Sequence, residues 1–354
     1  MYKSLRMLNW NVAGKRVFVR ADLNIHPITT HVVSSVTNTL KFQRLLPTLR
    51  WLKEHGARMT LATHIGRPNG YDTAYSTQPL TDYFSQAGFS TVWSTIPDLE
   101  KNSIQAADII LLENLRFYAQ EEVQNPLFAQ QMTHGADFFI EDGFGVLTRH
   151  ESSVTTAAEL FNPEHRSIGL LIQGELEHLQ PLRNGPKKPY LVMVGGGKGA
   201  EKLDVLSSFF TRATHIALCP GLSELPEAPA FVKEARKAGI TVLLPSDYCV
   251  YQDKNISIGP ETFKAWQPIL KTMETIVYNG MMGVQDAPET MVYTEKLFRL
   301  FMELPATILI AGGDTTQAAQ RWGIEANNIY LSTGGGSTLA YLGGRPLPGL
   351  SVID

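Results

Sequence analysis

Short apolar runs alternate along most of the chain with longer stretches whose apolar residues recur at helical spacing. Each apolar run ends in a glycine-rich or polar turn, and this alternation is typical of βα units. Strands joined through helices run parallel, so we expect an α/β fold of two lobes, each a parallel, Rossmann-like sheet flanked by helices. The predicted strands are 16–20, 59–63, 109–112, 138–141 and 168–172 in the first half, and 190–194, 215–218, 240–244, 275–278, 306–310 and 328–331 in the second.

A polar stretch separates the two sets of strands. Residues 173–179 (QGELEHL) predict a helix, and residues 184–189 (NGPKKP) predict a hinge. A chain of 354 residues is long enough for two domains. We therefore predict a first domain over 1–170, a connecting helix and hinge over 171–187, and a second domain over 188–342. The three prolines of segment 219–229 predict a loop there.

Composition narrows the class of protein. The net charge of −3 and the 18% of charged residues are ordinary for a globular chain and argue against a nucleic-acid-coating or disordered protein. With only Cys219 and Cys249, the chain cannot build a disulfide framework or a four-thiolate zinc site. No signal-like or membrane-spanning apolar stretch occurs. These features predict a cytoplasmic protein with neither a membrane nor a nucleic acid as partner.

Arginines follow the predicted strands of the first half. Ligands of parallel sheets bind outside the carboxyl ends of the strands, and guanidinium groups grip phosphate and carboxylate bidentately. Their recurrence at four strand ends predicts a site for a small, strongly anionic ligand. The residues concerned are Arg20 with Asp22 and Asn24, His64 with Arg67, Arg116, and Arg149 with His150.

A plainer alternative stands beside this interpretation for each residue. An arginine at a strand end can simply pair with a local carboxylate, as Arg116 could with Glu113. A single histidine such as His64 is more often structural than catalytic.

Glycine-rich turns follow four predicted strands of the second half. Such turns let backbone N–H groups at helix N-termini approach phosphates, and four on one sheet favour a nucleotide site. The alternative is tight strand-to-helix packing, with Asp314 and Ser337 as helix N-caps. The turns are 195–199 (GGGKG), 279–283 (NGMMG), 312–316 (GGDTT) and 334–338 (GGGST).

Lys198 and Lys202 stand four residues apart where a helix is expected to begin. Cations are electrostatically unfavourable at a helix N-terminus, which favours an anionic ligand there over solvated surface lysines. The chain has neither a Walker P-loop nor a dinucleotide fingerprint. One half thus suits a phosphorylated acid and the other a nucleotide, and phosphoryl transfer between them is the resulting hypothesis.

Read together, these motifs resemble those of phosphoglycerate kinases over nearly the whole chain. They occur in order at 19–24 (VRADLN), 64–68 (HIGRP), 112–117 (LENLRF), 141–145 (EDGFG) with Arg149, 195–198 (GGGK) with Lys202, 258–262 (IGPET), 279–283 (NGMMG), 312–315 (GGDT) and 332–336 (STGGG).

The resemblance implies a two-lobed kinase that reversibly moves a phosphoryl group between 1,3-bisphosphoglycerate and Mg-ADP, giving 3-phosphoglycerate and ATP after the lobes close. It also implies a monomer whose C-terminal tail, 343–354, packs on the first domain. Carried over by motif, Lys198, Lys41 and Arg149 are the candidate catalytic residues, and Asp314 lies by Mg2+. The substrate-binding set is Arg20, Asp22, Asn24, His64, Arg67, Arg116 and Arg149. The nucleotide-binding set is Gly196, Gly197, Lys198, Lys202, Asn279, Asp286, Gly312, Gly313, Asp314, Thr315, Gly334, Gly335 and Gly336.

The chain departs from the family pattern in several places, among them residues 23–27 (LNIHP), which stand where the family has Phe-Asn-Val-Pro, and Asp286, which stands where it has glutamate. Lys41 stands where the family has an arginine facing the transferring phosphoryl group, which keeps the charge but loses the bidentate fork. Met281 replaces a proline, and the short 218–222 stretch (LCPGL) replaces the turn that packs the adenine side. Two alternatives to an active phosphoglycerate kinase follow: a divergent relative that binds a phosphorylated acid or nucleotide without efficient transfer, and a kinase for another acyl phosphate.

Overall fold

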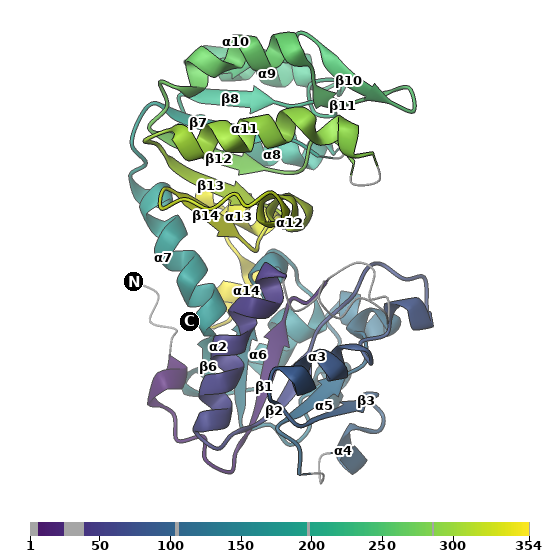
Figure 1. Ribbon diagram of the computed structural model, residues 1–354. Helices are drawn as coiled ribbons and strands as arrows, with labels where there is room; N and C mark the ends of the chain where they lie inside the picture. Colours follow the sequence, from purple (N-terminus) through teal and green to yellow (C-terminus); the bar gives the residue numbers. More distant parts are fainter. Residues whose placement is uncertain (1–5, 25–38, 103–105, 197–198, 285–286, 354) are drawn as a thin grey trace. The chain divides into compact units, whose positions relative to one another are not determined.

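The computed structural model describes residues 6–24, 39–102, 106–196, 199–284 and 287–353. The chain forms two compact units, one of Met1–Leu176 with Pro346–Asp354 and the other of Glu177–Arg345. Within the described ranges each unit contains a six-stranded parallel sheet flanked by helices, as the ribbon shows (Figure 1). The two-lobed α/β fold predicted from the sequence is therefore confirmed.

The sheet of the first unit has the strand order β3-β4-β2-β1-β5-β6. Its central strands are buried along almost their whole length, as expected for a parallel sheet covered on both faces. The strands are β1 (Arg16–Ala21), β2 (Arg58–Ala62), β3 (Thr91–Ser94), β4 (Ile109–Leu112), β5 (Phe138–Asp142) and β6 (Arg166–Ile168). The α-helices are α2 (Leu40–Glu54), α3 (Leu80–Gln86), α4 (Leu99–Asn102), α5 (Pro126–Met132), α6 (Ala157–Glu159) and α14 (Pro348–Ser351).

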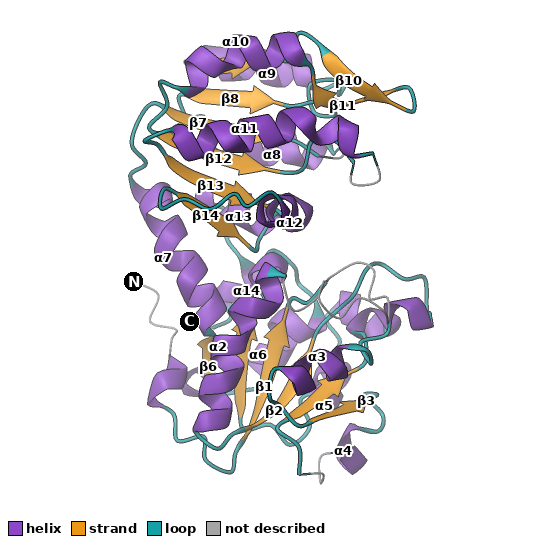
Figure 2. Cartoon of the chain, viewed as in Figure 1, coloured by secondary structure: helices purple, strands orange, loops and turns teal. Residues whose placement is uncertain are grey.

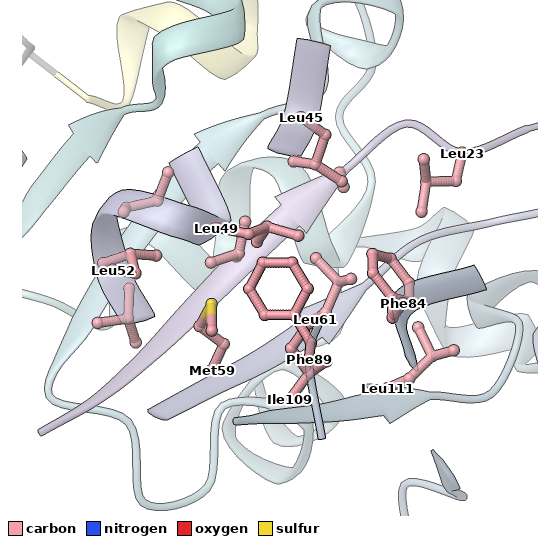
Figure 3. Close-up of a cluster of buried hydrophobic side chains, with 14 of the residues drawn as sticks. Leu23, Leu45, Leu49, Leu52, Met59, Leu61, Phe84, Phe89, Ile109 and Leu111 are labelled. Carbon is pink, nitrogen blue, oxygen red and sulfur yellow. The ribbon is translucent and has the colours of Figure 1, made fainter. Parts of the chain in front are cut away.

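One core of the first unit lies between helix α2 and the sheet. Leu45, Leu49 and Leu52 recur at helical spacing on one face of α2 and meet Met59 and Leu61 of β2 (Figure 3). All five side chains are buried almost completely. Burying each such side chain contributes about 1.5–3 kcal/mol, so this face fixes α2 on the sheet and places the start of the helix at the carboxyl end of β1.

The sheet of the second unit has the order β14-β13-β12-β7-β8-β9. Its strands are β7 (Tyr190–Val194), β8 (His215–Leu218), β9 (Thr241–Leu243), β12 (Thr275–Asn279), β13 (Thr307–Ala311) and β14 (Ile329–Ser332). A separate antiparallel hairpin joins β10 (Tyr248–Tyr251) to β11 (Lys254–Ile258) (Figure 2). The helices are α8 (Ala200–Ser207), α9 (Ala228–Lys237), α10 (Pro260–Leu270), α11 (Val292–Glu303), α12 (Gly313–Arg321) and α13 (Gly336–Leu342).

The predicted strand over 168–172 is wrong except at its first residue. Strand β6 ends at Ile168, and helix α7 (Leu170–Asn184) begins two residues later. The side chain of Thr48 accepts the N–H of Leu170, and the Asp142 carboxylate accepts that of Ile172. These contacts satisfy N–H groups that a helix leaves unpaired at its start, so the apolar run becomes the first turn of a helix.

The sequence also missed or misplaced smaller elements. Strand β3 and the β10–β11 hairpin were not predicted. The last two residues of the predicted loop 219–229 belong to helix α9, where Pro229 occupies an early position that tolerates proline.

The end of the chain lies on the first unit. The Leu147 carbonyl accepts the N–H of Gly349 at 3.0 Å, and Arg166 donates to the carbonyl of Val352 at 2.8 Å.

A separate feature concerns membranes: in the part of the chain that the structure describes, we find no helix with the length and apolar character needed to cross one.

Candidate functional site

Arg20 lies at the end of β1 and is completely buried. Its Nε donates to the Ser153 hydroxyl at 2.6 Å, and another donor bonds the Ala21 carbonyl. The remaining nitrogen, Nη2, lies 3.3 Å from His64 Nδ1 and 3.5 Å from the Glu151 carboxylate. Arg20 is therefore enclosed by this part of the chain, and its side chain has no solvent-facing surface.

Glu151 joins three predicted arginines that come from distant parts of the sequence. One of its carboxylate oxygens, Oε1, lies 2.9 Å from Arg116 and 3.0 Å from Arg149, and the other faces Arg20. Burial alone would raise the pKa of Glu151, but the charges of Arg20, Arg149 and Arg116 lower it. Glu151 is thus an ionised, buried carboxylate, and sequence reasoning missed it.

His64 follows β2 and is buried beside Arg20 and Arg149. Its Nε2 lies 3.4 Å from Arg149 Nη1, and its other ring nitrogen faces Arg20. Burial and the positive charge of Arg20 hold the pKa of His64 well below its usual range, despite the opposing effect of Asp22. The imidazole is therefore neutral near pH 7, and its unprotonated nitrogen can accept a hydrogen bond from one of the two arginines.

Asp22 and Lys41 form a close ion pair at the carboxyl edge of the sheet. Lys41 Nζ lies 2.7 Å from Asp22 Oδ2, and the side chains are only 16% and 8% exposed, respectively. Burial acts to raise the pKa of Asp22, but Lys41 and then His64 outweigh it, so the pKa is lowered. Asp22 also accepts the N–H of Asn24 at 3.2 Å.

Asn24 and Arg116 reach the loop that follows β2. The Asn24 side chain accepts the N–H of Gly66 at 2.8 Å, and Arg116 donates to the carbonyl of that same glycine at 3.1 Å. Arg67, the next residue, is exposed and makes no ion pair with any residue that the structure describes. The structure thus brings Arg20, Asp22, Asn24, His64, Arg116 and Arg149 together, with Arg67 on the adjoining loop.

The alternative pairing of Arg116 with Glu113 is wrong. The Glu113 carboxylate accepts hydrogen bonds from Ser76 and Thr77 and is buried. Arg116 instead pairs with Glu151, which is 35 residues further along the chain.

The four glycine turns of the second unit lie at neighbouring strand ends and are hydrogen-bonded in series. The Asn279 carbonyl accepts the N–H of Gly195 at 2.8 Å, and the Asn279 side chain donates to the carbonyl of Gly335 at 2.9 Å. The Gly334 carbonyl in turn accepts the N–H of Gly312 at 3.2 Å. The turns after β7, β12, β13 and β14 therefore form one continuous backbone surface.

Gly280 shows why glycine is needed there. Its φ is +92°, and a Cβ built on it would lie 2.3 Å from the Gly195 carbonyl oxygen. Only glycine permits this backbone conformation at so close an approach.

Lys202 and Asp314 lie in the first turns of α8 and α12. Lys202 Nζ donates to the Gly195 carbonyl at 3.2 Å, and burial lowers the pKa of this lysine. Asp314 is exposed, and Thr315 behind it is buried. The suggested N-cap roles of Asp314 and Ser337 are wrong, because the N-caps are Gly312 and Gly335, and Asp314 and Ser337 are each the second residue of their helix.

Three predicted nucleotide-site residues, Gly197, Lys198 and Asp286, lie outside the described residues. Gly196, Gly313 and Gly336 lie in the glycine turns already described. Across the described ranges, no three histidine, cysteine or acidic side chains gather as ligands for a metal ion.

The chain thus has two parallel sheets flanked by helices. Arginines cluster at the strand ends of one sheet, and glycine turns follow the strands of the other. These features define a class of two-lobed α/β proteins, and solved structures of that class are similar to this one. The structure of phosphoglycerate kinase from Coxiella burnetii superposes with a TM-score of 0.76 at 25% identity, covering 98% of each chain. The fold is also that of phosphoglycerate kinase from Pyrococcus horikoshii, with a TM-score of 0.79 at 24% identity, covering 99% of this chain and 98% of that one.

Sequence comparison identifies the family. The family model for phosphoglycerate kinase matches residues 7–225 and 221–345. The cytosolic phosphoglycerate kinase of Nicotiana tabacum is 31% identical over 97% of this chain and 96% of its own length. That of Borreliella afzelii is 29% identical, with 97% of each chain covered. The chain belongs to the phosphoglycerate kinase family.

Proposed function

We propose that the chain catalyses reversible phosphoryl transfer between 1,3-bisphosphoglycerate and ADP, giving 3-phosphoglycerate and ATP. The observation that carries the proposal is the convergence of Arg116, Arg149 and His64 at the carboxyl edge of the first sheet, in a member of this family. Such transfer needs no covalent intermediate, only two anions held in line with their charge neutralised.

The first unit would bind the phosphorylated acid. Arg149, which is 28% exposed on its side chain, and Arg67, which is exposed on the adjoining loop, would contact the anion directly. Arg116, whose side chain is only 8% exposed, would add its positive charge to the site, and the completely buried Arg20 would act by orienting His64 and Glu151. Asp22 and Asn24 would fix the edge of the site through Lys41 and Gly66.

The second unit would bind the nucleotide. Its continuous run of glycine turns offers backbone N–H groups at the starts of α12 and α13, and such groups suit phosphate oxygens. Lys202, half-buried and bonded to the Gly195 carbonyl, would neutralise phosphate charge. We assign Lys198 to the transferring phosphoryl group by its place in the family motif.

Mg2+ fits this second site through Asp314. The carboxylate is exposed in the first turn of α12 and makes no ion pair with a described residue. Mg2+ bound with a nucleotide takes only one or two protein carboxylates and fills its shell with phosphates and water, so a single aspartate suffices. The ion would supply charge neutralisation on the phosphates.

The proposal also covers the roles of the two domains, their movement during turnover, the oligomeric state and the location of the protein. The domain of 1–170 would take the acid and that of 188–342 the nucleotide, about the hinge of 171–187. The acid and the nucleotide must meet for transfer, so the two units would approach each other during turnover. We further propose that the chain acts as a monomer in the cytoplasm.

The test is ATP-dependent phosphorylation of 3-phosphoglycerate with Mg2+, followed through a coupled dehydrogenase. We expect turnover by the natural chain and a loss of about 100-fold or more in Lys198→Ala, because charge stabilisation of the transferring group is removed. Lys237→Ala is the matched control, since that lysine is exposed and pairs only with nearby Glu234 in the described structure.

The alternative functions give different results in the same assay. A binding protein without efficient transfer would show no turnover, yet 3-phosphoglycerate would still raise its melting temperature. A kinase for another acyl phosphate would turn over a different acid faster than 3-phosphoglycerate. Either result would contradict the proposal.

A further inference from the structure

The anion position among the arginines of the first unit already holds a carboxylate of the chain. Glu151 contacts Arg116 and Arg149 through the same oxygen, at 2.9 and 3.0 Å, and its second oxygen lies 3.5 Å from Arg20. The Glu151 side chain is only 8% exposed. Glu151 therefore offsets positive charge on three arginines at once, Arg20, Arg116 and Arg149.

The charges around Glu151 can be counted from the contacts. The three arginines contribute three positive charges and Glu151 one negative charge, while His64 is held neutral. Asp22 is balanced by Lys41, which lies 2.7 Å away. Arg20, Arg116, Arg149 and Glu151 taken by themselves therefore carry two net positive charges, and the same four positions carry three when Glu151 is replaced by a neutral residue.

Two other buried carboxyl groups, those of Glu121 and Glu141, also interact with the charge of Arg20. Glu121 accepts the Ser153 hydroxyl at 2.5 Å, and Glu141 accepts the N–H of Gly143 at 2.9 Å. Burial raises the pKa of Glu121 to about 7 and that of Glu141 well above its usual range. Among the described carboxylates, Glu151 is the one that lies within 4 Å of Arg20, Arg116 and Arg149, and these arginines lower its pKa.

We propose that Glu151 is a specificity-determining residue of the acid site, a resident carboxylate that weakens the binding of anions in proportion to their charge. The inference rests on the proposed function, which places the phosphorylated acid against Arg149 and Arg67. Like charges at a separation of about 4–6 Å disfavour each other by a factor of ten or more in equilibrium. Glu151 acts on the ligand through this repulsion and through the guanidinium donors that it occupies.

Glu151→Gln tests the proposal, because glutamine keeps the shape and an oxygen acceptor but loses the charge. Binding of 3-phosphoglycerate, with about three negative charges at pH 8, is compared with that of inorganic phosphate by calorimetry. We expect 3-phosphoglycerate to bind about tenfold more tightly to the variant, and phosphate to gain less. Glu122→Gln is the matched control, since Glu122 is an exposed glutamate of the same unit and makes no ion pair with a described residue.

Kinetics supply a readout that a purely structural role would not move. The KM for 3-phosphoglycerate should fall about tenfold in Glu151→Gln, while the KM for ATP stays unchanged. Glu151→Asp, which keeps the charge, should bind 3-phosphoglycerate within about threefold of the natural chain.

Each other outcome has a definite meaning. If the natural chain binds 3-phosphoglycerate and Glu151→Gln binds it equally or more weakly, the inference fails and the proposed function stands. If the natural chain binds neither anion, both fail. Should Glu151→Gln not fold because Arg20 loses its carboxylate, Arg20→Met is compared with Arg20→Met/Glu151→Gln, since removing a buried pair together is often tolerated. The double variant should again bind about tenfold more tightly, and equal binding would overturn the inference.

Discussion

Removing the positive charge of Lys41 should destabilise the first unit through Asp22. The two side chains lie 2.7 Å apart at the end of β1 and are 16% and 8% exposed. Lys41→Met keeps most of the length of the side chain but leaves the Asp22 carboxylate buried without its cation. The change therefore isolates the electrostatic part of the contact.

The magnitude follows from the burial of the pair. Losing one partner of a fully buried pair costs about 3–5 kcal/mol, and the partial exposure of Lys41 brings the expected loss in the free energy of unfolding to about 2–3 kcal/mol. Lys53→Met is the matched control. Lys53 pairs with Asp108 at 2.9 Å, but their side chains are 41% and 25% exposed, so its loss should cost at most about 1 kcal/mol.

Urea unfolding at several pH values measures both the size and the cause of the effect. The pKa of Asp22 is lowered in the folded chain, so the contribution of the pair is present above the ordinary aspartate pKa of about 4 and is lost as the pH falls below it. In Lys41→Met the buried carboxyl takes up a proton at higher pH than in the natural chain. The stability gap should therefore narrow as the pH is lowered from 7.5 to 4.

A double-mutant cycle with Asp22→Asn decides whether the reasoning holds. We expect a coupling energy above about 1 kcal/mol between the two positions. A coupling near zero, or a gap that does not change with pH, would refute the argument that charge pairing carries the effect.

Two further predictions concern the buried carboxyl group of Glu121 and the glycine turn at Gly280. Burial raises the pKa of Glu121 to about 7. The free energy of unfolding of the natural chain should therefore fall by up to about 3 kcal/mol relative to that of Glu121→Gln as the pH rises from 4.5 to 8. If urea unfolding gives the two proteins the same pH dependence, this prediction is contradicted. Gly280→Ala should lower the free energy of unfolding by about 2 kcal/mol or more, because the added Cβ meets the Gly195 carbonyl at a φ of +92°. Gly239→Ala, at a φ of +81° with open space around the new Cβ, should cost only about 1 kcal/mol by the same measurement, and equal losses would show that the close approach is unimportant.

The sequence predicted the elements whose burial is complete. Strands β1 and β7 are buried on both faces, so their apolar runs are nearly continuous and bounded by turns. The β10–β11 hairpin escaped prediction because its residues are mostly half-exposed and mix polar with apolar side chains. Residues 170–172 read as a strand because the contacts of Thr48 and Asp142 that start helix α7 come from distant segments.

Contacts between distant segments also limited how much of the site could be predicted. The positions of the arginines could be predicted because strand ends of one parallel sheet meet at one edge. Glu151 could not, because its pairing with Arg20 and Arg116 depends on how the loop after β5 folds back over β1 and β4. The one signal available was its position two residues after Arg149. The ion pair between Lys41 and Asp22 likewise depends on where α2 begins.

The central claim, phosphoryl transfer to the carboxyl group of 3-phosphoglycerate, is tested most directly by trapping the product. The purified chain is incubated with ATP, Mg2+, 3-phosphoglycerate and hydroxylamine, which converts an acyl phosphate into a stable hydroxamate. The account predicts that hydroxamate and ADP form in equal amounts, and only when 3-phosphoglycerate is present. ADP without hydroxamate, or neither product at high protein concentration, would contradict it.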